Sequence, residues 1–193
     1  MDSLSQIINY TIGSAHGAWS WILQKYIENP LIIENRKFDI RLWILVTSND
    51  PLTIWCWTRP YIWFPAADYN SKNLKDNFIH LTNNSVAKHA PKTNKILGDG
   101  NMWFSEELQK YLDEKFHWDV WTEDIMPQMH TLVINSLKCV ADKLGTHKGS
   151  FEIFGYDIMI DEDLNPWLLE VNSSPTMEYS TVSHLTYRES QKN

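Results

Sequence analysis

Hydrophobic and polar positions alternate with strand periodicity in the first third of the chain. Residues 37–46 begin with strict alternation and then become apolar on both faces, which is typical of a strand that enters a sheet interior. Turn residues occupy positions 48–51, and residues 52–64 are dense in aromatic and β-branched side chains. We expect the two segments to form strands and to pair as a hairpin.

Three more strands are predicted outside this hairpin. Residues 151–160 and 167–171 are mostly apolar, and the polar segment 161–166 between them is typical of a hairpin turn. Another strand is predicted over residues 21–27, where Asn29-Pro30 would stop it.

Two helices are predicted between these strands. The first opens at Ser105, the expected N-cap, and the second opens at Thr122 and ends at Gly145. Apolar residues of the second helix recur at steps of three and four, which is the period of a packed helix. The class is therefore α+β, a mainly antiparallel sheet with helices packed on it.

Residues 1–18 are polar and give no packing pattern, so we expect regular structure to begin at Trp19. The expected organisation is a polar N-terminal segment over 1–18, one domain over 19–180 and a polar tail over 181–193. The hydrophobic content of 43% and the charged content of 21% fit a chain that folds around a core.

Composition excludes several classes of protein. Two cysteines exclude a disulfide scaffold and favour a reducing compartment. The N-terminus lacks the basic start and apolar core of a signal peptide, and no apolar run is long enough to span a bilayer. We therefore expect no membrane partner.

The net charge of −7 is unevenly distributed. Residues 121–193 carry 5 cations and 11 anions, so −6 of the −7 lies there. A generic nucleic-acid binder is usually basic, so we expect no nucleic-acid partner. The carboxylates of the last segment either solvate a face or hold a cation.

The final predicted hairpin carries the most specific candidate site. Glu170 and Asn172 share one face of their strand, and Asp157 lies on the strand beside it. Three hard oxygen ligands that converge in this way suit Mg²⁺. The alternative is a set of ordinary strand carboxylates facing water, and the pattern alone leaves both interpretations open. The apolar neighbours of these residues indicate a largely buried hairpin, in which carboxylates need partners.

Two weaker candidates lie earlier in the chain. Lys37, Asp39 and Arg41 share one strand face, which is consistent either with phosphate binding or with a solvated face of salt bridges. Residues 80–85 read His-Leu-Thr-Asn-Asn-Ser, a pattern usual in loops and helix caps, so His80 is a weak candidate for a catalytic base. Neither cysteine has a basic neighbour in sequence, which argues against a thiol nucleophile.

Taken together, five ordered segments resemble the tubulin–tyrosine-ligase-like family, a branch of the ATP-grasp ligases. The segments read WILQKYIENP, RKFDIR, HLTNN, FGYD and WLLEVN, and they lie at residues 21–30, 36–41, 80–84, 154–157 and 167–172. Asn101-Met102-Trp103 and the run NSSPTM at 172–177 look most like the glycine-adding branch. The resemblance implies the C-terminal lobe of an ATP-grasp fold.

The resemblance also implies a role for each matching residue. Asp157, Glu170 and Asn172 match Mg²⁺ ligands, and Arg41 matches the catalytic cation that faces the phosphorylated carboxylate of the substrate. The residues that match ATP contacts are Gln24, Lys25, Tyr26, Ile27, Lys37, Asp39, Thr82 and Asn83.

The implied reaction is ATP- and Mg²⁺-dependent amide formation. A glutamate side chain on an acidic tubulin tail becomes an acyl phosphate, and the amine of glycine then displaces phosphate. The implied partners are tubulin or microtubules and glycine, with Arg36, Lys37, Arg41 and Arg59 as the local cations for the acidic tail. The implied location is the cytoplasm and its cytoskeleton, with the cilium or flagellum implied by the glycine-adding branch.

Two departures from the family favour other interpretations. Relatives carry an N-terminal and a central domain before the adenine segment, so this chain resembles the C-terminal lobe alone, and a truncated, catalytically inactive remnant is one alternative. Trp63 stands where relatives usually carry an arginine for the acidic substrate, and Arg59 is the candidate substitute on the same strand face. A glutamate-adding ligase is the other alternative, because no single residue identifies the amino-acid pocket.

Overall fold

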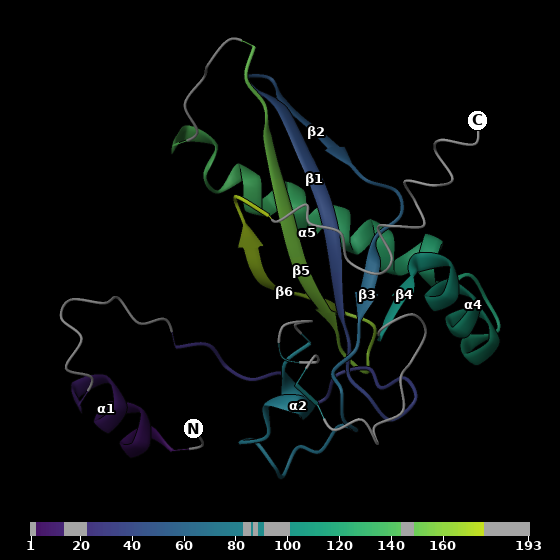
Figure 1. Ribbon diagram of the computed structural model, residues 1–193. Helices are drawn as coiled ribbons and strands as arrows, with labels where there is room; N and C mark the ends of the chain where they lie inside the picture. Colours follow the sequence, from purple (N-terminus) through teal and green to yellow (C-terminus); the bar gives the residue numbers. More distant parts are fainter. Residues whose placement is uncertain are drawn as a thin grey trace.

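A computed structural model of the chain describes residues 3–13, 23–82, 86, 89–90, 101–143 and 149–175. Its main body is a twisted sheet with two long helices against one face (Figure 1). The strands are β1 (Asp39–Asn49), β2 (Leu52–Cys56), β3 (Tyr61–Trp63), β4 (Met102–Phe104), β5 (Glu152–Ile160) and β6 (Pro166–Asn172). The helical elements are α1 (Leu4–Gly13), α2 (Asn77–His80), α4 (Ser105–Phe116), the π-helical turn η1 (Trp121–Ile125), α5 (Met126–Lys138) and the 3₁₀ turn η2 (Ala141–Lys143).

Strand β1 is the centre of the sheet. The strands lie in the order β4-β3-β1-β5-β6, and all of these pairs are antiparallel. One edge of β1 pairs with β5, while the other edge pairs first with β3 over residues 39–41 and then with β2 over residues 44–49. The expected α+β class and mainly antiparallel sheet are therefore confirmed.

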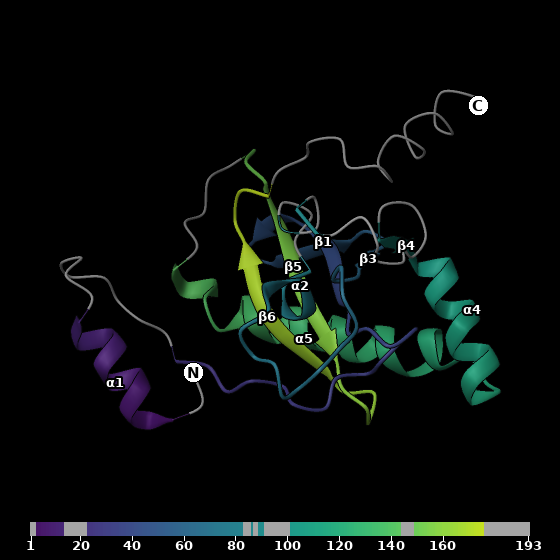
Figure 2. The same ribbon diagram turned by 60° about the horizontal axis from the view of Figure 1, so that its bottom comes forward.

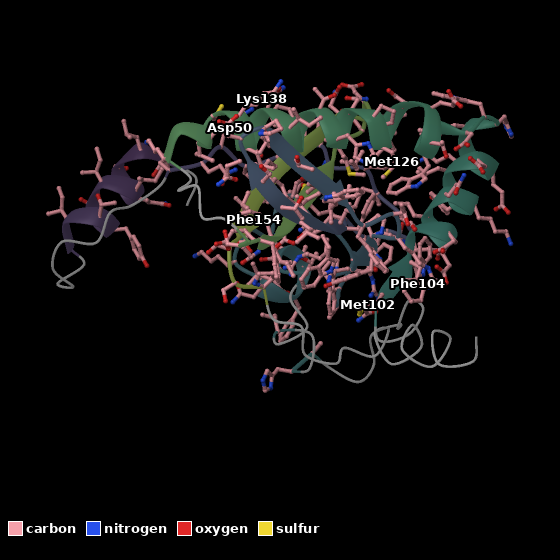
Figure 3. The ribbon with its side chains drawn as sticks, turned by 90° about the horizontal axis from the view of Figure 1, so that it is seen from above. Asp50, Met102, Phe104, Met126, Lys138 and Phe154 are labelled. Atoms are coloured by element: carbon pink, nitrogen blue, oxygen red, sulfur yellow. The ribbon has the colours of Figure 1, made fainter. Side chains whose placement is uncertain are left out.

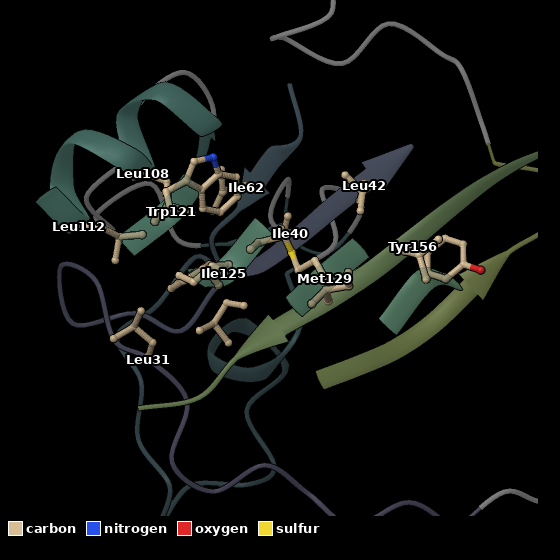
Figure 4. Close-up of a cluster of buried hydrophobic side chains, with 14 of the residues drawn as sticks. Leu31, Ile40, Leu42, Ile62, Leu108, Leu112, Trp121, Ile125, Met129 and Tyr156 are labelled. Atoms are coloured by element: carbon tan, nitrogen blue, oxygen red, sulfur yellow. The ribbon is translucent and has the colours of Figure 1, made fainter. Parts of the chain in front are cut away.

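The two faces of the sheet differ in burial. Side chains alternate along β1 between buried and half-buried, because successive residues of a strand point to opposite faces. The buried face packs on α4 and α5 and forms the core shown in Figure 4. Each large side chain fully buried there contributes about 1.5–3 kcal/mol. They include Ile40, Leu42, Ile62, Leu108, Leu112, Met129 and Ile158. We call the opposite side, where Asp39, Arg41 and Trp43 lie, the open face.

Figure 3 shows how α5 covers the core face, with Met126 and Lys138 marking its two ends. Helix α1 lies apart from the sheet in Figure 2. Most of its apolar side chains are exposed, with Leu4 at 67% and Ile12 at 79% of full exposure. Among the described residues, no helix is both long enough and apolar enough to cross a bilayer.

Both predicted hairpins form, but the second strand of the first one is divided. β1 pairs with β2, and β5 pairs with β6 through the turn at 161–165. The expected single strand over 52–64 is wrong, because it ends at Cys56 and resumes as β3 at Tyr61. Pro60 lies in the interruption, and proline has no N–H to donate to a ladder.

The helix boundaries also differ from the expected ones. Ser105 is the first residue of α4 rather than its N-cap; Phe104 is the N-cap, and its N–H donates to the Glu107 carboxylate at 2.8 Å. The second helix begins as the π-helical turn at Trp121, just before Pro127, whose missing N–H interrupts the regular α-helical bonding. α5 ends at Lys138, and Gly145 lies outside the described residues.

Two expectations near the N-terminus are wrong. Helix α1 forms within residues 1–18, where no regular structure was expected; the Ser3 hydroxyl accepts from the Gln6 N–H at 3.4 Å, and Gly13 ends the helix. Residues 23–27 contain no strand, and residues 21 and 22 lie outside the described residues. The chain joins the sheet only from Asn29 and Pro30, which bond to the β5–β6 turn.

Candidate active site

Three strands bring a group of polar side chains together on the open face. In the sheet register, Arg41 of β1 lies opposite Asp157 of β5, and Asp157 lies opposite Glu170 of β6. Asn172 lies two residue pairs further along, opposite Gly155. Since directly opposite residues point to the same face, the four polar side chains converge. We call Arg41, Asp157, Glu170 and Asn172 the polar centre.

A bulge in β6 puts Glu170 on this face. Ile158 pairs with Leu168 and Asp157 pairs with Glu170, so Leu169 is the extra residue. Without the bulge, Asp157 would pair with Leu169, and Glu170 would point toward the core. The position of the carboxylate therefore depends on one inserted residue.

The Arg41 guanidinium holds Asp157 with two hydrogen bonds. Its Nε donates to Asp157 Oδ1, and its Nη2 donates to Asp157 Oδ2 at 2.9 Å. The side chains are 20% and 18% exposed, so the pair lies in a partly desolvated position. A two-point contact of this kind fixes the orientation of both groups.

Asn172 links the two carboxylates. Its Nδ2 donates to Asp157 Oδ2 at 3.3 Å and to Glu170 Oε1 at 3.1 Å. Asp157 is half-buried, whereas Glu170 is exposed, so the prediction of a largely buried hairpin is wrong for Glu170.

The charges of the polar centre favour a bound cation. Burial raises the pKa of Asp157, the neighbouring Glu170 raises it further, and Arg41 opposes both. For Arg41, burial lowers the pKa, but the contacts with Asp157 outweigh it and the net shift is upward, so Arg41 stays charged. Two carboxylates against one guanidinium leave a net charge of about −1 when all are ionised.

The donor set fits Mg²⁺. No group of three His, Cys, Asp or Glu side chains is placed to hold a metal within the described residues. The polar centre instead offers two carboxylates and an amide, and Mg²⁺ characteristically takes few protein ligands and completes its shell with water or phosphate. Rotation of the Asn172 amide would turn its oxygen toward the carboxylates in place of its nitrogen.

A second group of side chains surrounds Asp39. Lys37 Nζ lies 3.3 Å from Asp39 Oδ1, and the Thr82 hydroxyl donates to Asp39 Oδ2. Lys37 is only 2% exposed, so the alternative of a solvated strand face is wrong for this lysine. Asp39 and Arg41 are two residues apart on β1, which puts this group beside the polar centre.

The predicted adenine residues line a pocket. Gln24, Lys25, Tyr26 and Ile27 form one wall of a cavity of about 330 Å³. The opposite wall is the β5–β6 turn at 161–163 together with Trp167 and Leu168. Leu168 precedes Glu170 by two residues on β6, which is about 7 Å along a strand. The pocket and the polar centre are therefore neighbours along one strand.

The β5–β6 turn is more ordered than its sequence suggests. Asp161 accepts hydrogen bonds from the backbone N–H groups of Asp163 and Asn165 and from the indole N–H of Trp167 at 2.8–3.0 Å. Burial alone would raise the pKa of Asp161, but these hydrogen bonds lower it. Asp161 thus shapes one wall of the pocket.

Comparison with known proteins identifies the family. The sequence profile of the tubulin-tyrosine ligase family matches residues 1–188. The chain belongs to this family. The resemblance inferred from the five motifs is therefore confirmed, and the α+β fold agrees with the ATP-grasp-like fold of the family.

Curated relatives share this stretch of sequence. The chain is 52% identical over 163 residues to tubulin glycylase 3C of Tetrahymena thermophila, which covers 83% of this chain and 15% of the relative. It is 40% identical over 187 residues to human tubulin monoglycylase TTLL3, which covers 94% and 24%. It is 41% identical over 164 residues to mouse protein monoglycylase TTLL8, which covers 83% and 20%. The chain thus spans between 15% and 24% of the length of these relatives.

Several cations of this family member are already engaged. Arg36 is 2% exposed and donates to the Pro65 carbonyl at 3.0 Å and to Asn101 at 3.1 Å, so the expectation that Arg36 attracts an acidic substrate is wrong. Arg59 precedes β3, bonds to Glu106 at 2.6 Å and lies 3.8 Å over the Phe104 ring. Its predicted role in substrate binding requires exchange of Glu106 for the substrate.

Two aromatic residues of β3 are neighbours of the site; Trp63 was singled out from the sequence, whereas Tyr61 was missed. Tyr61 lies opposite Arg41, and Trp63 lies opposite Asp39, with the two rings edge to face at 5.7 Å. Burial raises the pKa of Tyr61, and the nearby Arg41 opposes this. The hairpin predicted between residues 37–46 and 52–64 already implied that this segment pairs with β1, but the sequence did not give the register that sets Tyr61 opposite Arg41. Asn83, a predicted ATP contact, lies outside the described residues.

Proposed function

We propose that the protein is an ATP- and Mg²⁺-dependent ligase that adds glycine to glutamate side chains of tubulin. The observation that carries the proposal is the polar centre, a half-buried Arg41–Asp157 pair next to Glu170 and Asn172. The curated names of similar proteins, tubulin glycylase and tubulin monoglycylase, support glycine as the added group and tubulin as the acceptor.

The proposed reaction has two steps. A substrate carboxylate oxygen attacks the γ-phosphorus of ATP, the bond from that phosphorus to the β,γ-bridging oxygen breaks, and ADP leaves. The α-amine of glycine then attacks the acyl carbon, phosphate leaves with the bonding electrons, and the amine loses a proton. Activation is needed because a free carboxylate is a poor electrophile, and positioned cations stabilise the charge on the transferring group.

Arg41 is the residue we propose to face the reacting carboxylate. The Arg41 nitrogens Nε and Nη2 donate to Asp157. The third nitrogen of the guanidinium, Nη1, lies over the backbone of Gly155. The Nη1 hydrogens would donate to an oxygen of the acyl group, while Asp157 keeps the guanidinium oriented. A fixed cation of this kind costs little reorganisation when charge develops.

Asp157, Glu170 and Asn172 would hold Mg²⁺ at the polar centre. The ion would neutralise charge on the phosphate oxygens. Lys37, Asp39 and Thr82 form the neighbouring group that we propose for the nucleotide. Lys37 is fixed by Asp39 and buried, so its charge would act at one defined position.

The adenine ring would lie against residues 24–27. Support comes from the pocket of about 330 Å³ that these residues line, and from its position one short stretch of β6 away from Glu170. Asn83 remains a predicted contact on the nucleotide side. The proposed location is the cytoplasmic cytoskeleton, including cilia or flagella, where an acidic tubulin tail would meet Arg41 and Arg59.

Transfer of labelled glycine to purified tubulin tests the proposal. The 193-residue chain is expected to incorporate glycine only with ATP and Mg²⁺, and Glu170→Gln is expected to reduce incorporation at least about 100-fold. Glu152→Gln is the matched control, since Glu152 is an exposed carboxylate on the same hairpin, outside the site. Incorporation of glutamate but not glycine would contradict the amino-acid assignment. Absence of any transfer by a folded chain would contradict the ligase proposal.

A further inference from the structure

His80 connects two parts of the proposed nucleotide site. It is the last residue of α2, and its ring lies between Tyr26 and the backbone of Asn73. The Tyr26 hydroxyl lies 2.8 Å from His80 Nδ1, and the Asn73 carbonyl oxygen lies 2.8 Å from His80 Nε2. The sequence made this histidine a weak candidate for a catalytic base.

These two contacts define the state of the imidazole. A carbonyl oxygen can only accept, so Nε2 must carry a proton and donate to Asn73. In the neutral ring, Nδ1 then has a lone pair and accepts from the Tyr26 hydroxyl. Both nitrogens are used in structural hydrogen bonds, which argues against a free general base.

His80 connects two segments that we propose to contact different parts of the nucleotide. Tyr26 belongs to the pocket segment 24–27, which makes no strand ladder and depends on side-chain contacts for its position. Thr82 follows His80 by two residues and donates to Asp39. The position of His80 therefore affects the adenine side and the phosphate side of the proposed site together.

Aromatic contacts support the same connection. The His80 ring lies edge to face with Tyr26 at 5.7 Å and with Tyr69 at 6.0 Å. The Tyr69 hydroxyl donates to the Glu28 carbonyl at 2.8 Å, so it holds the same segment at a second point. Three rings and two hydrogen bonds thus fasten residues 26–28 to α2 and the loop before it, and the contact with Asn73 fixes the His80 ring.

We propose that His80 is a positioning residue for nucleotide binding, which acts by holding Tyr26 through Nδ1 and so fixing the pocket segment against Thr82 and Asp39. The proposal rests on the proposed function, because it takes residues 24–27 and Thr82 as nucleotide contacts. It assigns His80 no part in proton transfer.

Calorimetry of Mg²⁺-ATP binding to the full chain tests this role. Tyr26→Phe and His80→Leu should each weaken binding about tenfold, and the double variant should be no weaker than His80→Leu alone, because Tyr26→Phe removes a contact that His80→Leu has already removed. His80→Asn should recover much of the affinity, since its side-chain oxygen can accept from Tyr26 near the place of Nδ1. His130→Leu, on α5 and outside the connection, should leave the affinity unchanged.

Kinetics separate positioning from catalysis. A positioning role predicts a raised KM for ATP with kcat nearly unchanged at saturating ATP. A general base would instead lose about 10²–10⁴ in kcat, with unchanged ATP affinity. Such a loss of kcat with unchanged ATP affinity would overturn the proposal. So would an unchanged affinity in Tyr26→Phe, or additive effects in the double variant.

A measurement without ATP distinguishes this proposal from the proposed function. Nitrogen-15 NMR of the neutral form of His80 should report one tautomer, with the proton on Nε2, and Tyr26→Phe should shift the Nδ1 resonance. If the wild-type chain fails to bind ATP, the proposed function fails, and the connection stands if these NMR signals appear. An equal mixture of tautomers, unaffected by Tyr26→Phe, would overturn the connection itself.

Discussion

Gly155 illustrates how a residue without a side chain can shape the site. A Cβ at this position would lie 3.2 Å from Arg41 Nη1, 3.3 Å from Arg41 Cδ and 3.2 Å from Pro175 Cβ. These distances are shorter than ordinary van der Waals contacts, so the Arg41 side chain lies across β5 where Gly155 leaves space. The guanidinium reaches Asp157 by this route.

Gly155→Ala is therefore expected to displace Arg41 and to destabilise the protein by about 1–3 kcal/mol, the usual range for overpacking. Urea denaturation would measure the free energy of unfolding. In an Arg41→Ala background the same substitution should cost less, because the arginine atoms it meets are gone. An equal cost in both backgrounds would contradict the placement of Arg41 over Gly155.

The sequence predicted the three candidate metal ligands but not why they meet. Glu170 and Asn172 share a face through simple alternation, which a pattern shows. The pairing of Glu170 with Asp157 requires the extra residue Leu169, and a regular hairpin would have turned Glu170 toward the core. Nothing in the local pattern marks Leu169 as a bulge, so the pattern grouped the three residues without showing the register that joins them, and the resemblance to the family supported the same grouping.

At the scale of elements, the β5–β6 turn organises the end of the hairpin. One carboxylate, Asp161, accepts from Asp163, Asn165 and Trp167, and Pro30 pairs with Asp161 as an isolated bridge. The turn residues were predicted from their type. Their hydrogen bonds to an aromatic side chain and to the incoming chain were not, since those partners are set by tertiary packing.

Asp161→Ala should destabilise the protein by about 1–3 kcal/mol, because it leaves several donors without their acceptor. Asp161→Asn keeps one oxygen for the backbone N–H groups and should cost less. Thermal or urea unfolding of the two variants would measure the difference. Equal stability of wild type and Asp161→Ala would contradict the described turn.

The stability that Asp161 contributes should depend on pH in a defined direction. Hydrogen bonds lower the pKa of Asp161 below its ordinary value of 3.8, so the folded state favours the ionised form. The stabilisation is fully present above pH 3.8 and is lost as the pH falls through the lowered value. The advantage of wild type over Asp161→Asn should therefore shrink below pH 3.8.

Pairing between distant elements was the least predictable part of the fold. β1 and β5 make the largest interface in the sheet, and Arg41 and Asp157 are 116 positions apart in sequence. Local periodicity finds each strand but not its neighbour. For the same reason, local periodicity did not reveal that residues 52–64 divide into β2 and β3. The two strands pair with successive stretches of one β1 edge.

At the scale of the whole molecule, the net negative charge of the chain disfavours the binding of an acidic substrate. The chain has a net charge of −7, Arg36 and Lys37 are buried, and Arg59 is held by Glu106. Attraction of a tubulin tail would therefore depend on the few cations at the open face, with Arg41 at its centre.

The most direct test of the account is calorimetric titration of the 193-residue chain with ATP in the presence of Mg²⁺. The account predicts micromolar binding that requires Mg²⁺, is weakened at least about tenfold by Glu170→Gln and is unchanged by Glu152→Gln. A folded chain that binds no Mg²⁺-ATP, or that binds it equally well after Glu170→Gln, would contradict the assignment of the polar centre as the site of metal and nucleotide.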